Sequence, residues 1–518
     1  MYRYLCVLTL GQPSPGVQDG IPAPQNGAGA TLHPSQYPSG GNMPIPASAA
    51  AQPAPAAPQA PNPEREWEHF PEYPEYASGH QRTPWPPGFV GKVAQYLYCH
   101  SPSPVPEYAI AAAVAFFAGV CGRGWICSGT GLNHDIVVIG ESGTGKNIVH
   151  QGIANIGRQL SGTPIATFII NAKMASAPAL LKNVAANPCF LQLIGEVGKM
   201  YRAYSKSKHG DTLDELFTVK LDLWERSGPD GNAVGILYSN PDKNVQPVGV
   251  TGIAHSTLGE STPSVFFGAL TTDMMNDGLL SRLWIIEYEG EDPQFNEHRL
   301  HEMPKEWINY LSNLVRAASG RLNQQPIDHS NESAALIRKF AQECRDEKLN
   351  AGKDPAQRQL WVRAYEKVIR LAALLAVADN YLFPIVQVEH VEWAISMLRH
   401  ANLTVQRRVC DGDISDDADH AREAMVLQRC RRWIEAERKD PKEERLRQNS
   451  IIPRRFLQQE VSSKDLFKNH RFGAVTVLNL TMRSLVENGY LMEVDKTKLA
   501  EDFNVRSVCW RVLELDKR

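Results

Sequence analysis

One segment restricts the possible folds of this chain more than any other. A short, continuous apolar run at Asp135–Ile139 leads directly into a glycine-rich turn, and helical periodicity follows over 148–160. A continuous apolar run of this length is typical of a strand buried in a parallel sheet. The turn consists of Gly140, Glu141, Ser142, Gly143, Thr144, Gly145, Lys146 and Asn147. Strand, glycine-rich turn and helix in this order predict an α/β fold in which the turn binds phosphate groups.

The residue types of this turn indicate a nucleotide ligand. Backbone N–H groups and the dipole at a helix N-terminus attract an anion, and Lys146 is long enough to reach the β- and γ-phosphates. We therefore expect ATP as the ligand, accompanied by Mg²⁺. The residue after the lysine is normally Ser or Thr, whose hydroxyl binds Mg²⁺, but here it is Asn147. The Asn147 amide oxygen can bind the ion or a water on the ion, and weaker magnesium binding is the alternative.

A second strand candidate carries an expected catalytic residue. The apolar run Cys189–Ile194 ends in Gly195 and Glu196. In ATPases with such a turn, the strand next to it ends in an acidic pair, of which the first residue holds Mg²⁺ and the second polarises the attacking water. Glu196 fits the second position, whereas Gly195 lacks the carboxylate of the first. The alternative for Glu196 is a surface glutamate at a strand end.

A hairpin is expected further along the chain. Two apolar runs, 234–238 and 245–250, flank the turn Ser239–Asn244, which contains Asn, Pro and Asp. Such turn residues between strand-like runs indicate a β-hairpin. Lys243 would lie at its tip, either as a solvated turn lysine or as a DNA-binding residue in a central channel.

Polar and basic residues follow two later strand candidates. The apolar run Val248–Ala254 leads to a polar cluster, His255–Pro263, where a sensor of the γ-phosphate would lie. Arg282 directly precedes the apolar run 283–286. A ring-forming ATPase has an arginine at such a position that reaches the phosphate of a neighbouring subunit, and a local salt bridge is the alternative. Arg363 is a candidate second sensor that contacts the nucleotide, or an ordinary surface arginine.

Composition divides the 518 residues into five expected segments. Residues 1–65 are dominated by Pro, Ala, Gly and Gln and have few bulky apolar side chains, so they cannot offset the entropy of ordering. Helices are expected at Gly88–Tyr98 and Pro106–Val120. The expected segments are a disordered tail at 1–65, an arm with helices at 66–130, an AAA-like ATPase core at 131–320, a helical lid at 321–412 and a winged-helix domain at 413–518.

The last segment has the order of elements of a winged helix. Helical patterns at 421–437, 453–461, 463–469 and 476–488 precede strand candidates at 490–494 and 508–513. The last helix of a winged helix commonly enters the major groove of DNA, which makes Arg483 a candidate DNA-binding residue. Residues 421–518 contain 21 Lys and Arg against 15 Asp and Glu. This basic character favours DNA as the partner, and a protein-binding winged helix is the alternative.

The net charge, the cysteine spacing and the hydropathy of the sequence exclude several classes of protein. The net charge of −3 excludes a uniformly basic nucleic-acid coat protein. The nine cysteines contain no C-x-x-C pair and no histidines at zinc-finger spacing, so we expect no disulfide framework and assign no residue as a metal ligand. No apolar run approaches the ~20 residues that span a bilayer, and the N-terminal apolar stretch lacks the features of a signal peptide. We expect a cytoplasmic protein without membrane contact.

The stretch from Pro84 to His400 resembles a family of uncharacterised P-loop ATPases of prophages, plasmids and other mobile elements, often encoded beside primases. The similar phrases are Thr83–Gly88, Pro104–Glu107, Gly131–Asn133 before the glycine-rich turn, Gly278–Arg282 and Arg363–Ala378. The chain is more loosely similar to the AAA-type replicative helicases of viruses, in which a hairpin lysine follows DNA in the channel. The resemblance implies an oligomer, with a hexamer favoured, that does ATP-driven work on DNA, and a separate primase as a partner.

Three functions remain open from the sequence, of which the third is a defence ATPase of a mobile element. The first is an ATP-dependent DNA helicase or replication initiator of a phage or mobile element. The second is a nucleotide-dependent module that binds DNA or a partner protein without translocation, such as a helicase loader or an origin-binding platform. The unusual residues Asn147 and Gly195 favour the second function.

Overall fold

The structure is a computed structural model that describes residues 69–76, 80, 82–237, 239, 240, 242, 244–271, 274, 277–321, 323–352, 355–410, 418–468 and 473–513. The tail predicted at 1–65 lies outside these ranges, and so does Lys243. Within these ranges, the helices are too short or too polar to cross a membrane.

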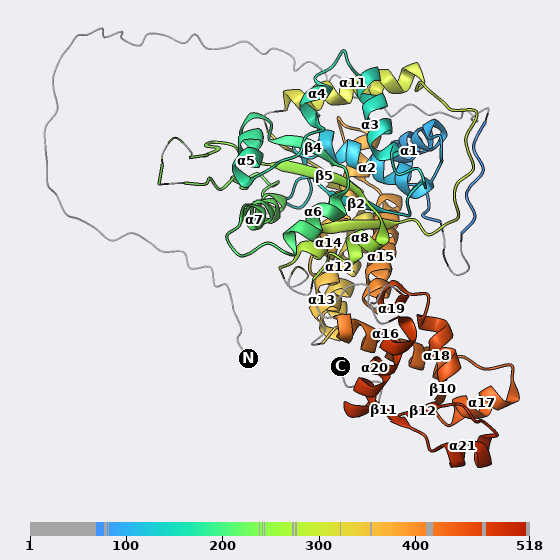
Figure 1. The fold of residues 1–518 in the computed structure, drawn as a ribbon. Coiled ribbons are helices and arrows are strands. Elements are labelled where there is room, and N and C mark those ends of the chain that lie inside the picture. The colour runs from blue at the N-terminus through green and yellow to red at the C-terminus, as the bar shows by residue number, and fades with distance from the viewer. Residues whose placement is uncertain are drawn as a thin grey trace, which may run out of the picture. The chain divides into compact units, whose positions relative to one another are not determined.

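A five-stranded parallel sheet forms the centre of the fold (Figure 1). Its strands are, in spatial order, β3 (Ile169–Ile170), β4 (Cys189–Ile194), β5 (Ala254–Ser261), β2 (Asp135–Ile139) and β6 (Leu283–Glu287). In register, Ile139 at the end of β2 pairs with Ser261 of β5 and with Glu287 of β6. The carboxyl ends of β2, β5 and β6 therefore lie at one edge of the sheet. The predicted α/β class and the predicted strands at 135–139 and 189–194 are confirmed.

Helices surround the sheet. The helices before or between its strands are α1 (Gly88–His100), α2 (Pro106–Cys121), α3 (Ile148–Gln159), α4 (Ile165–Phe168), α5 (Ala177–Ala186), α6 (Val197–Tyr204), α7 (Thr212–Glu225), α8 (Pro263–Phe267) and α10 (Leu279–Arg282). The helices after its last strand are α11 (Lys305–Gly320), α12 (Asn331–Asn350), α13 (Pro355–Val362), α14 (Ala364–Asp379) and α15 (Val388–Cys410). Two short parallel pairs, β1 (Trp125–Ile126) with β7 (Gln325–Pro326) and β8 (Asp328–His329) with β9 (Ile385–Val386), connect distant parts of the chain. The two N-terminal helices that the sequence predicts are confirmed as α1 and α2.

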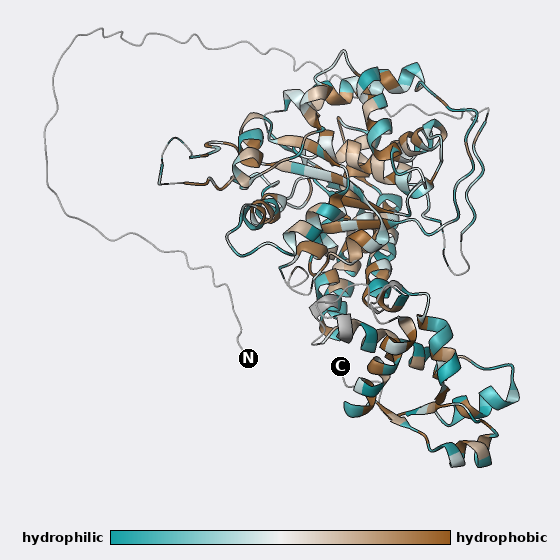
Figure 2. Ribbon diagram, viewed as in Figure 1, coloured by the Kyte–Doolittle hydropathy of each residue, from teal (hydrophilic) through white to brown (hydrophobic). Residues whose placement is uncertain are grey.

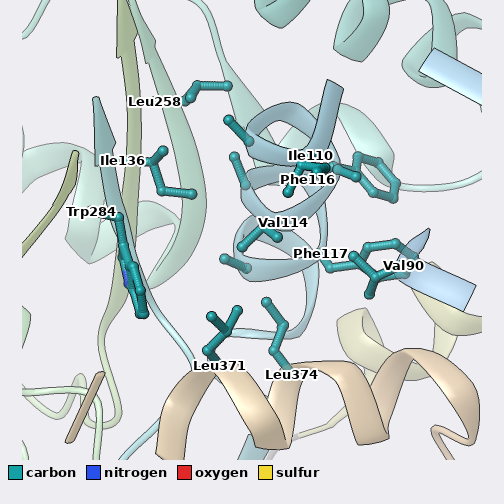
Figure 3. Close-up of a cluster of buried hydrophobic side chains, with 14 of the residues drawn as sticks. Val90, Ile110, Val114, Phe116, Phe117, Ile136, Leu258, Trp284, Leu371 and Leu374 are labelled. Carbon is teal, nitrogen blue, oxygen red and sulfur yellow. The ribbon is translucent and has the colours of Figure 1, made fainter. Parts of the chain in front are cut away.

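The helix α2 lies inside the protein. All of its residues are buried, because its Ala, Val, Ile and Phe side chains leave no polar face for solvent. In Figure 3, α2 lies between Ile136 and Leu258 of the sheet on one side and Val90 of α1 on the other, and Leu374 of α14 approaches it from a third direction. Burial of a Val, Leu, Ile or Phe side chain contributes roughly 1.5–3 kcal/mol to the stability of the fold. The sheet, α1 and α14 are therefore held together through α2.

One hydrophobic core extends over three of the segments expected from composition. Buried side chains from Phe89 to Val405 form a single cluster, and the apolar residues gather on the central strands and the helices beside them (Figure 2). The helix α14 is buried over almost its whole length. The helices of 66–130 and of 321–412 therefore pack on the same core as the sheet.

The C-terminal residues form a unit with a core of its own. Its elements are α16 (Ala418–Glu435), α17 (Pro441–Gln448), β10 (Ile451–Pro453), α18 (Arg454–Val461), α19 (Asp465–Lys468), α20 (Ala474–Glu487), β11 (Leu491–Glu493), α21 (Lys496–Phe503) and β12 (Cys509–Val512). The three strands form an antiparallel sheet in the order β10, β12, β11. Its buried residues include Trp433, Leu457, Leu478 and Leu485. The predicted helices and the last two strands are confirmed, whereas β10, α17 and α21 were not predicted.

Candidate functional site

The glycine-rich turn connects the carboxyl end of β2 to the N-terminus of α3. Gly143 and Gly145 have φ angles of 94° and 87°, which residues with a Cβ rarely adopt. Gly145 also passes so close to Ser103 that a Cβ would lie 2.6 Å from the Ser103 carbonyl oxygen. Within the described residues, no acceptor binds the backbone N–H groups of 142–147. These groups at the start of a helix are available to an anion.

The turn is braced by α2. The Tyr108 hydroxyl donates to Thr144 Oγ1 at 2.8 Å, and the Thr144 hydroxyl donates to the Glu141 carbonyl oxygen at 2.8 Å. Burial raises the pKa of Tyr108 well above its usual value, so this hydroxyl keeps its proton. A Cβ on Gly140 would lie 1.8 Å from the Tyr108 hydroxyl oxygen. Glycine at position 140 therefore makes room for the tyrosine that fixes the turn.

Lys146 points back onto the turn. Its Nζ donates to the carbonyl oxygens of Gly140 and Glu141 at 2.7 and 2.6 Å. Burial lowers the pKa of the Lys146 ammonium, and the nearby carboxylates of Glu260, Glu141 and Glu196 oppose this shift. A phosphate anion would compete with these neutral carbonyl groups for the ammonium, because hydrogen bonds to a charged acceptor are stronger.

A cavity of about 350 Å³ opens beside the turn. It lies at the edge of the sheet where β2, β4 and β5 end. Its lining includes Ser142, Gly143, Gly145, Lys146, Asn147, Glu196, Glu260, Ser261 and Thr262. The structure therefore brings the predicted catalytic residue Glu196 to the same cavity as the predicted phosphate-binding residues.

Glu196 occupies an unusual backbone conformation. It lies between β4 and α6 with φ 45° and ψ 46°, a left-handed conformation that is uncommon outside glycine and is found at functional sites. Its side chain is 62% exposed and lies 3.5 Å from Lys199 Nζ. Gly198 allows α6 to approach β5, because a Cβ there would lie 2.2 Å from Ser261 Oγ. This close approach sets the position of Glu196 relative to β5.

Two expectations about the strands were wrong. The strand next to β2 on this side is β5, which separates β2 from β4 and its Glu196. In addition, β5 begins at Ala254 and contains most of the polar cluster that was expected to follow a strand at Val248–Ala254. These polar residues are buried with partners on other strands: His255 lies 3.2 Å from Gln192, and Thr257 donates to Asp135 at 2.6 Å. Only the last residues of the cluster reach the cavity.

Two residues of the cavity region received no role from the sequence. Glu260 is the second-last residue of β5, and its side chain is 17% exposed. His150 lies in the first turn of α3, with its Nε2 3.9 Å from Glu260 Oε1. His150 Nε2 and Glu260 Oε2 are both buried and have no hydrogen-bond partner among the described residues. The only sequence signal for Glu260 was its place near the end of the polar cluster.

The donors at the cavity fit Mg²⁺ better than a transition metal. Within the described residues, no three His, Cys, Asp or Glu side chains gather as they would around a tightly held metal ion. The oxygen donors that line the cavity include the amide of Asn147 and the carboxylate of Glu260. Mg²⁺ is usually bound by one or two protein carboxylates together with substrate phosphates and water.

The predicted hairpin is confirmed only in part, because the described residues of 234–250 form isolated bridges and no strand. Ile236 and Val245 pair in antiparallel fashion through two backbone hydrogen bonds of 2.8 and 3.0 Å, and Asn232 pairs with Thr251. Lys243, the residue predicted at its tip, lies outside the described residues.

Arg282 and Arg363 lie together, far from the glycine-rich turn. Both form an ion pair with Oε1 of Glu225 at the end of α7. Arg282 directly precedes β6, so this cluster lies at the amino ends of the strands, whereas the turn follows a carboxyl end. The structure therefore does not bring Arg363 to the glycine-rich turn of its own chain. The reason is packing: Arg363 caps the start of α14, which runs beside the sheet.

The cluster around Glu225 is crowded with cations. The guanidinium of Arg370 lies 3.8 Å from the centroid of the Trp224 ring, and those of Arg282 and Arg363 lie 5.7 and 5.9 Å from it. Burial lowers the pKa of Arg282, and the nearby Arg363 lowers it further, whereas Glu225 opposes the shift. Glu225 thus offsets repulsion between two arginines.

Arg483 lies on α20 of the C-terminal unit, and its side chain is exposed. Thr476 and Asn479 are also exposed on this helix. Residues at these spacings share one helix face. The sequence singled out Arg483 but not its two polar neighbours.

Comparisons with known proteins place the chain in no family. No protein-family model matches the sequence, and no curated protein matches it. Among solved structures, the chain is similar to one described as "Structure of Drosophila ORC bound to DNA", with 14% sequence identity and a TM-score of 0.17. The alignment covers 85% of this chain and 94% of that chain. A TM-score of this size carries no argument about shared fold or function.

Proposed function

We propose that the protein is a P-loop ATPase with an AAA-like core. The observation that carries this proposal is the cavity that brings together free N–H groups of 142–147, Lys146 and Glu196. Free N–H groups at a helix N-terminus, a lysine and a nearby carboxylate are the groups that phosphoryl transfer to water requires.

In the proposed reaction, the N–H groups of the turn bind the phosphates of ATP. Lys146 exchanges its contacts with the carbonyl groups of Gly140 and Glu141 for the β- and γ-phosphates. Glu196 accepts a proton from the water that attacks the γ-phosphorus, while the bond from that phosphorus to the bridging oxygen breaks and ADP leaves. Mg²⁺, when bound, would neutralise phosphate charge, and Asn147 and Glu260 would hold it through their side-chain oxygens.

We infer DNA as the macromolecular partner. The order of α16, β10, α18, α20, β11 and β12 in the C-terminal unit, with β12 between the other two strands, supports a winged helix. The exposed face of α20 presents Thr476, Asn479 and Arg483, which are residue types that contact base edges and phosphates. In this proposal α20 enters the major groove, and Arg483 contributes to binding.

A ring-shaped oligomer, with a hexamer as the favoured size, accounts for the arginines. Arg282 and Arg363 lie at the opposite edge of the sheet from the turn of their own chain, so a phosphate that they contact belongs to another copy. Lys243, between the paired segments of the hairpin, would face DNA in the channel. With the resemblance described above, these features support a helicase or replication initiator of a phage or mobile element, working with a separate primase.

ATP turnover with and without forked DNA tests this function. We expect DNA to stimulate turnover. We expect Lys146→Ala to abolish ATP binding, because it removes the lysine that the turn supplies, and Glu196→Gln to bind ATP but not hydrolyse it. Lys182→Ala, which changes an exposed lysine outside the cavity, is the matched control. Unchanged ATP affinity in Lys146→Ala would contradict the proposed site.

A nucleotide-dependent binding module without translocation is the second candidate. It is favoured by Asn147 and Gly195, which replace the hydroxyl and the carboxylate that commonly hold Mg²⁺. This candidate predicts tight ATP and DNA binding with little turnover on any DNA and no separation of a forked duplex. The same turnover measurement therefore distinguishes the two functions.

A further inference from the structure

Glu260 has a largely buried carboxylate, one oxygen of which has no hydrogen-bond partner among the described residues. Its Oε2 is buried and accepts no hydrogen bond from a described residue. His150 Nε2 lies 3.9 Å from Oε1, beyond the range of about 2.7–3.2 Å for a hydrogen bond. Among the described residues, no lysine or arginine nitrogen lies within the 4.0 Å of an ion pair with this carboxylate. A carboxylate in this state costs free energy unless something else binds it.

The position of Glu260 relates it to the phosphate-binding turn. β5 lies next to β2, and Glu260 pairs in register with Val138, two residues before Gly140. The two strands are also joined by a 3.2 Å hydrogen bond from Gly140 N to the Ser261 carbonyl oxygen. Glu260, Lys146 and Asn147 line the same cavity. The carboxylate therefore lies where a cation bound to nucleotide phosphates would be.

Neither of the two other positions considered for a cation ligand, 195 and 196, fills this role. Gly195, at the position where a magnesium carboxylate is usual, has no side chain, and a Cβ there would meet no atom within 4 Å. Glu196 is 62% exposed, and Lys199 lies 3.5 Å from its carboxylate. Glu196 also follows β4, which lies one strand further from β2. Position 195 thus supplies no ligand, whereas the nearer strand β5 carries a carboxylate with an unpartnered oxygen.

We propose that Glu260, together with the amide oxygen of Asn147, holds the divalent cation that accompanies the nucleotide. The cation ligand has moved from the end of β4 to the end of β5, so the loss at Gly195 is compensated on the neighbouring strand. Mg²⁺ suits this donor set, because it takes one or two protein oxygens and completes its shell with phosphate oxygens and water. This inference rests on the proposed nucleotide site.

Two binding measurements on the full chain test the inference without activity. The first is titration with a fluorescent ATP analogue, in EDTA and in Mg²⁺. The second is electron paramagnetic resonance of Mn²⁺ in the presence of ADP. We expect Glu260→Gln to bind the analogue in EDTA at least as tightly as the parent, because a negative charge beside the phosphates is gone. We expect it to lose the tightening by Mg²⁺ and to bind Mn²⁺ at least about tenfold more weakly.

Matched variants identify the cause of such a loss. Glu196→Gln should keep the tightening by Mg²⁺, because Glu196 acts on water in the proposed reaction. Glu306→Gln changes an exposed glutamate of α11 and should match the parent. Glu260→Asp, which keeps the charge and shortens the side chain, should retain part of the Mn²⁺ affinity. If the parent and Glu260→Gln show the same Mg²⁺ effect, or the parent shows none, the inference is wrong.

The failure of the cation site and the failure of the nucleotide site give different results. If the parent binds no ATP analogue in either condition, the nucleotide site itself is wrong. If the parent binds the analogue and Glu260→Gln keeps full Mn²⁺ affinity, only the role of Glu260 is wrong. A thermal unfolding curve of each variant shows that it is folded.

Discussion

Lys367 is a single residue with a large predicted effect on stability. It lies on α14 and is only 2% exposed. Its Nζ donates to the Leu283 carbonyl oxygen at 2.6 Å and lies 4.7 Å from the centroid of the Trp284 ring. Burial lowers the pKa of Lys367 to about 7. A lysine of this kind is charged in the unfolded chain over a pH range in which it is neutral in the folded protein.

This difference fixes the sign of a pH dependence. Between about pH 7 and the ordinary value of 10.5, the unfolded state binds a proton that the folded state has released, so the free energy of unfolding rises with pH. Lys367→Met removes this contribution. We expect the parent to gain stability relative to Lys367→Met across this window, as measured by urea unfolding followed by tryptophan fluorescence. Lys305→Met, at an exposed position, should show no such trend, and a constant difference for Lys367→Met would contradict the prediction.

At the scale of elements, the contact between α6 and β5 positions Glu196. Gly198 is buried in the first turn of α6. A Cβ there would lie 2.2 Å from Ser261 Oγ, 3.0 Å from Val265 Cγ1 and 3.2 Å from Phe266 N. Backbone atoms and a branched side chain cannot all move away, so α6 itself would have to shift.

Gly198→Ala should therefore act against the usual helix preference. In an exposed helix interior this change stabilises by about 1 kcal/mol, but here we expect a loss of about 1–3 kcal/mol from overpacking. ATP turnover should fall because Glu196 moves, while ATP affinity should stay close to that of the parent. Gly162→Ala, where a Cβ meets no atom within 4 Å, is the control. Stability and turnover equal to the parent in Gly198→Ala would show that α6 does not position Glu196.

The elements that the sequence predicted correctly have a strong local pattern. The strands at 135–139 and 189–194 are continuous apolar runs, and α2 is apolar on nearly all faces. The strand β5 was placed too early because His255 and Thr257 look like surface residues in sequence. They are buried because Gln192 and Asp135, on other strands, satisfy their polar groups. No local pattern contains that information.

The part of the candidate site that was predictable from sequence also depends on local patterns. The turn residues and Glu196 follow directly on apolar runs, and both reach the cavity. Glu260 lies near the turn only because β5 is next to β2 in the sheet. The order of strands in a sheet cannot be read from a local sequence pattern. The edge of the sheet at which Arg363 lies was not predictable for a similar reason, since the packing of α14 on the sheet decides where its first turn lies.

At the scale of the molecule, the C-terminal unit has its own hydrophobic core. Deletion of 421–518 should therefore weaken DNA binding much more than ATP binding. Binding through phosphates should also decrease steeply with salt in the full chain, because counterions are released from DNA. Fluorescence anisotropy with a labelled duplex at about 0.15 M salt measures both. If the truncated protein binds the duplex as tightly as the full chain, the unit binds a protein instead.

The ring can be tested by mixing subunits. Arg282→Ala should lower turnover in every condition without weakening DNA binding. In mixtures with the parent, turnover should fall more steeply than the fraction of variant subunits rises, because each variant subunit makes an interface with its neighbour inactive. Arg282→Ala mixed with Glu196→Gln should recover some turnover, since some interfaces then combine the intact Glu196 of one subunit with the intact Arg282 of the other. No recovery at any ratio, together with the mass of a monomer in ATP, would rule out the ring.

In the proposed ring, the ion pairs of Glu225 would link subunit assembly to nucleotide binding. Glu225 is shared by Arg282 and Arg363 within one chain, so a phosphate from a neighbouring subunit would have to displace this carboxylate before the arginines could bind it. Without nucleotide nothing displaces it, and the two arginines contribute little to association. Thermodynamic coupling is reciprocal. If bound nucleotide raises the affinity between subunits by some factor, assembly raises the affinity for nucleotide by the same factor. A single internal carboxylate would thus make ring closure depend on the nucleotide concentration, with no separate assembly factor.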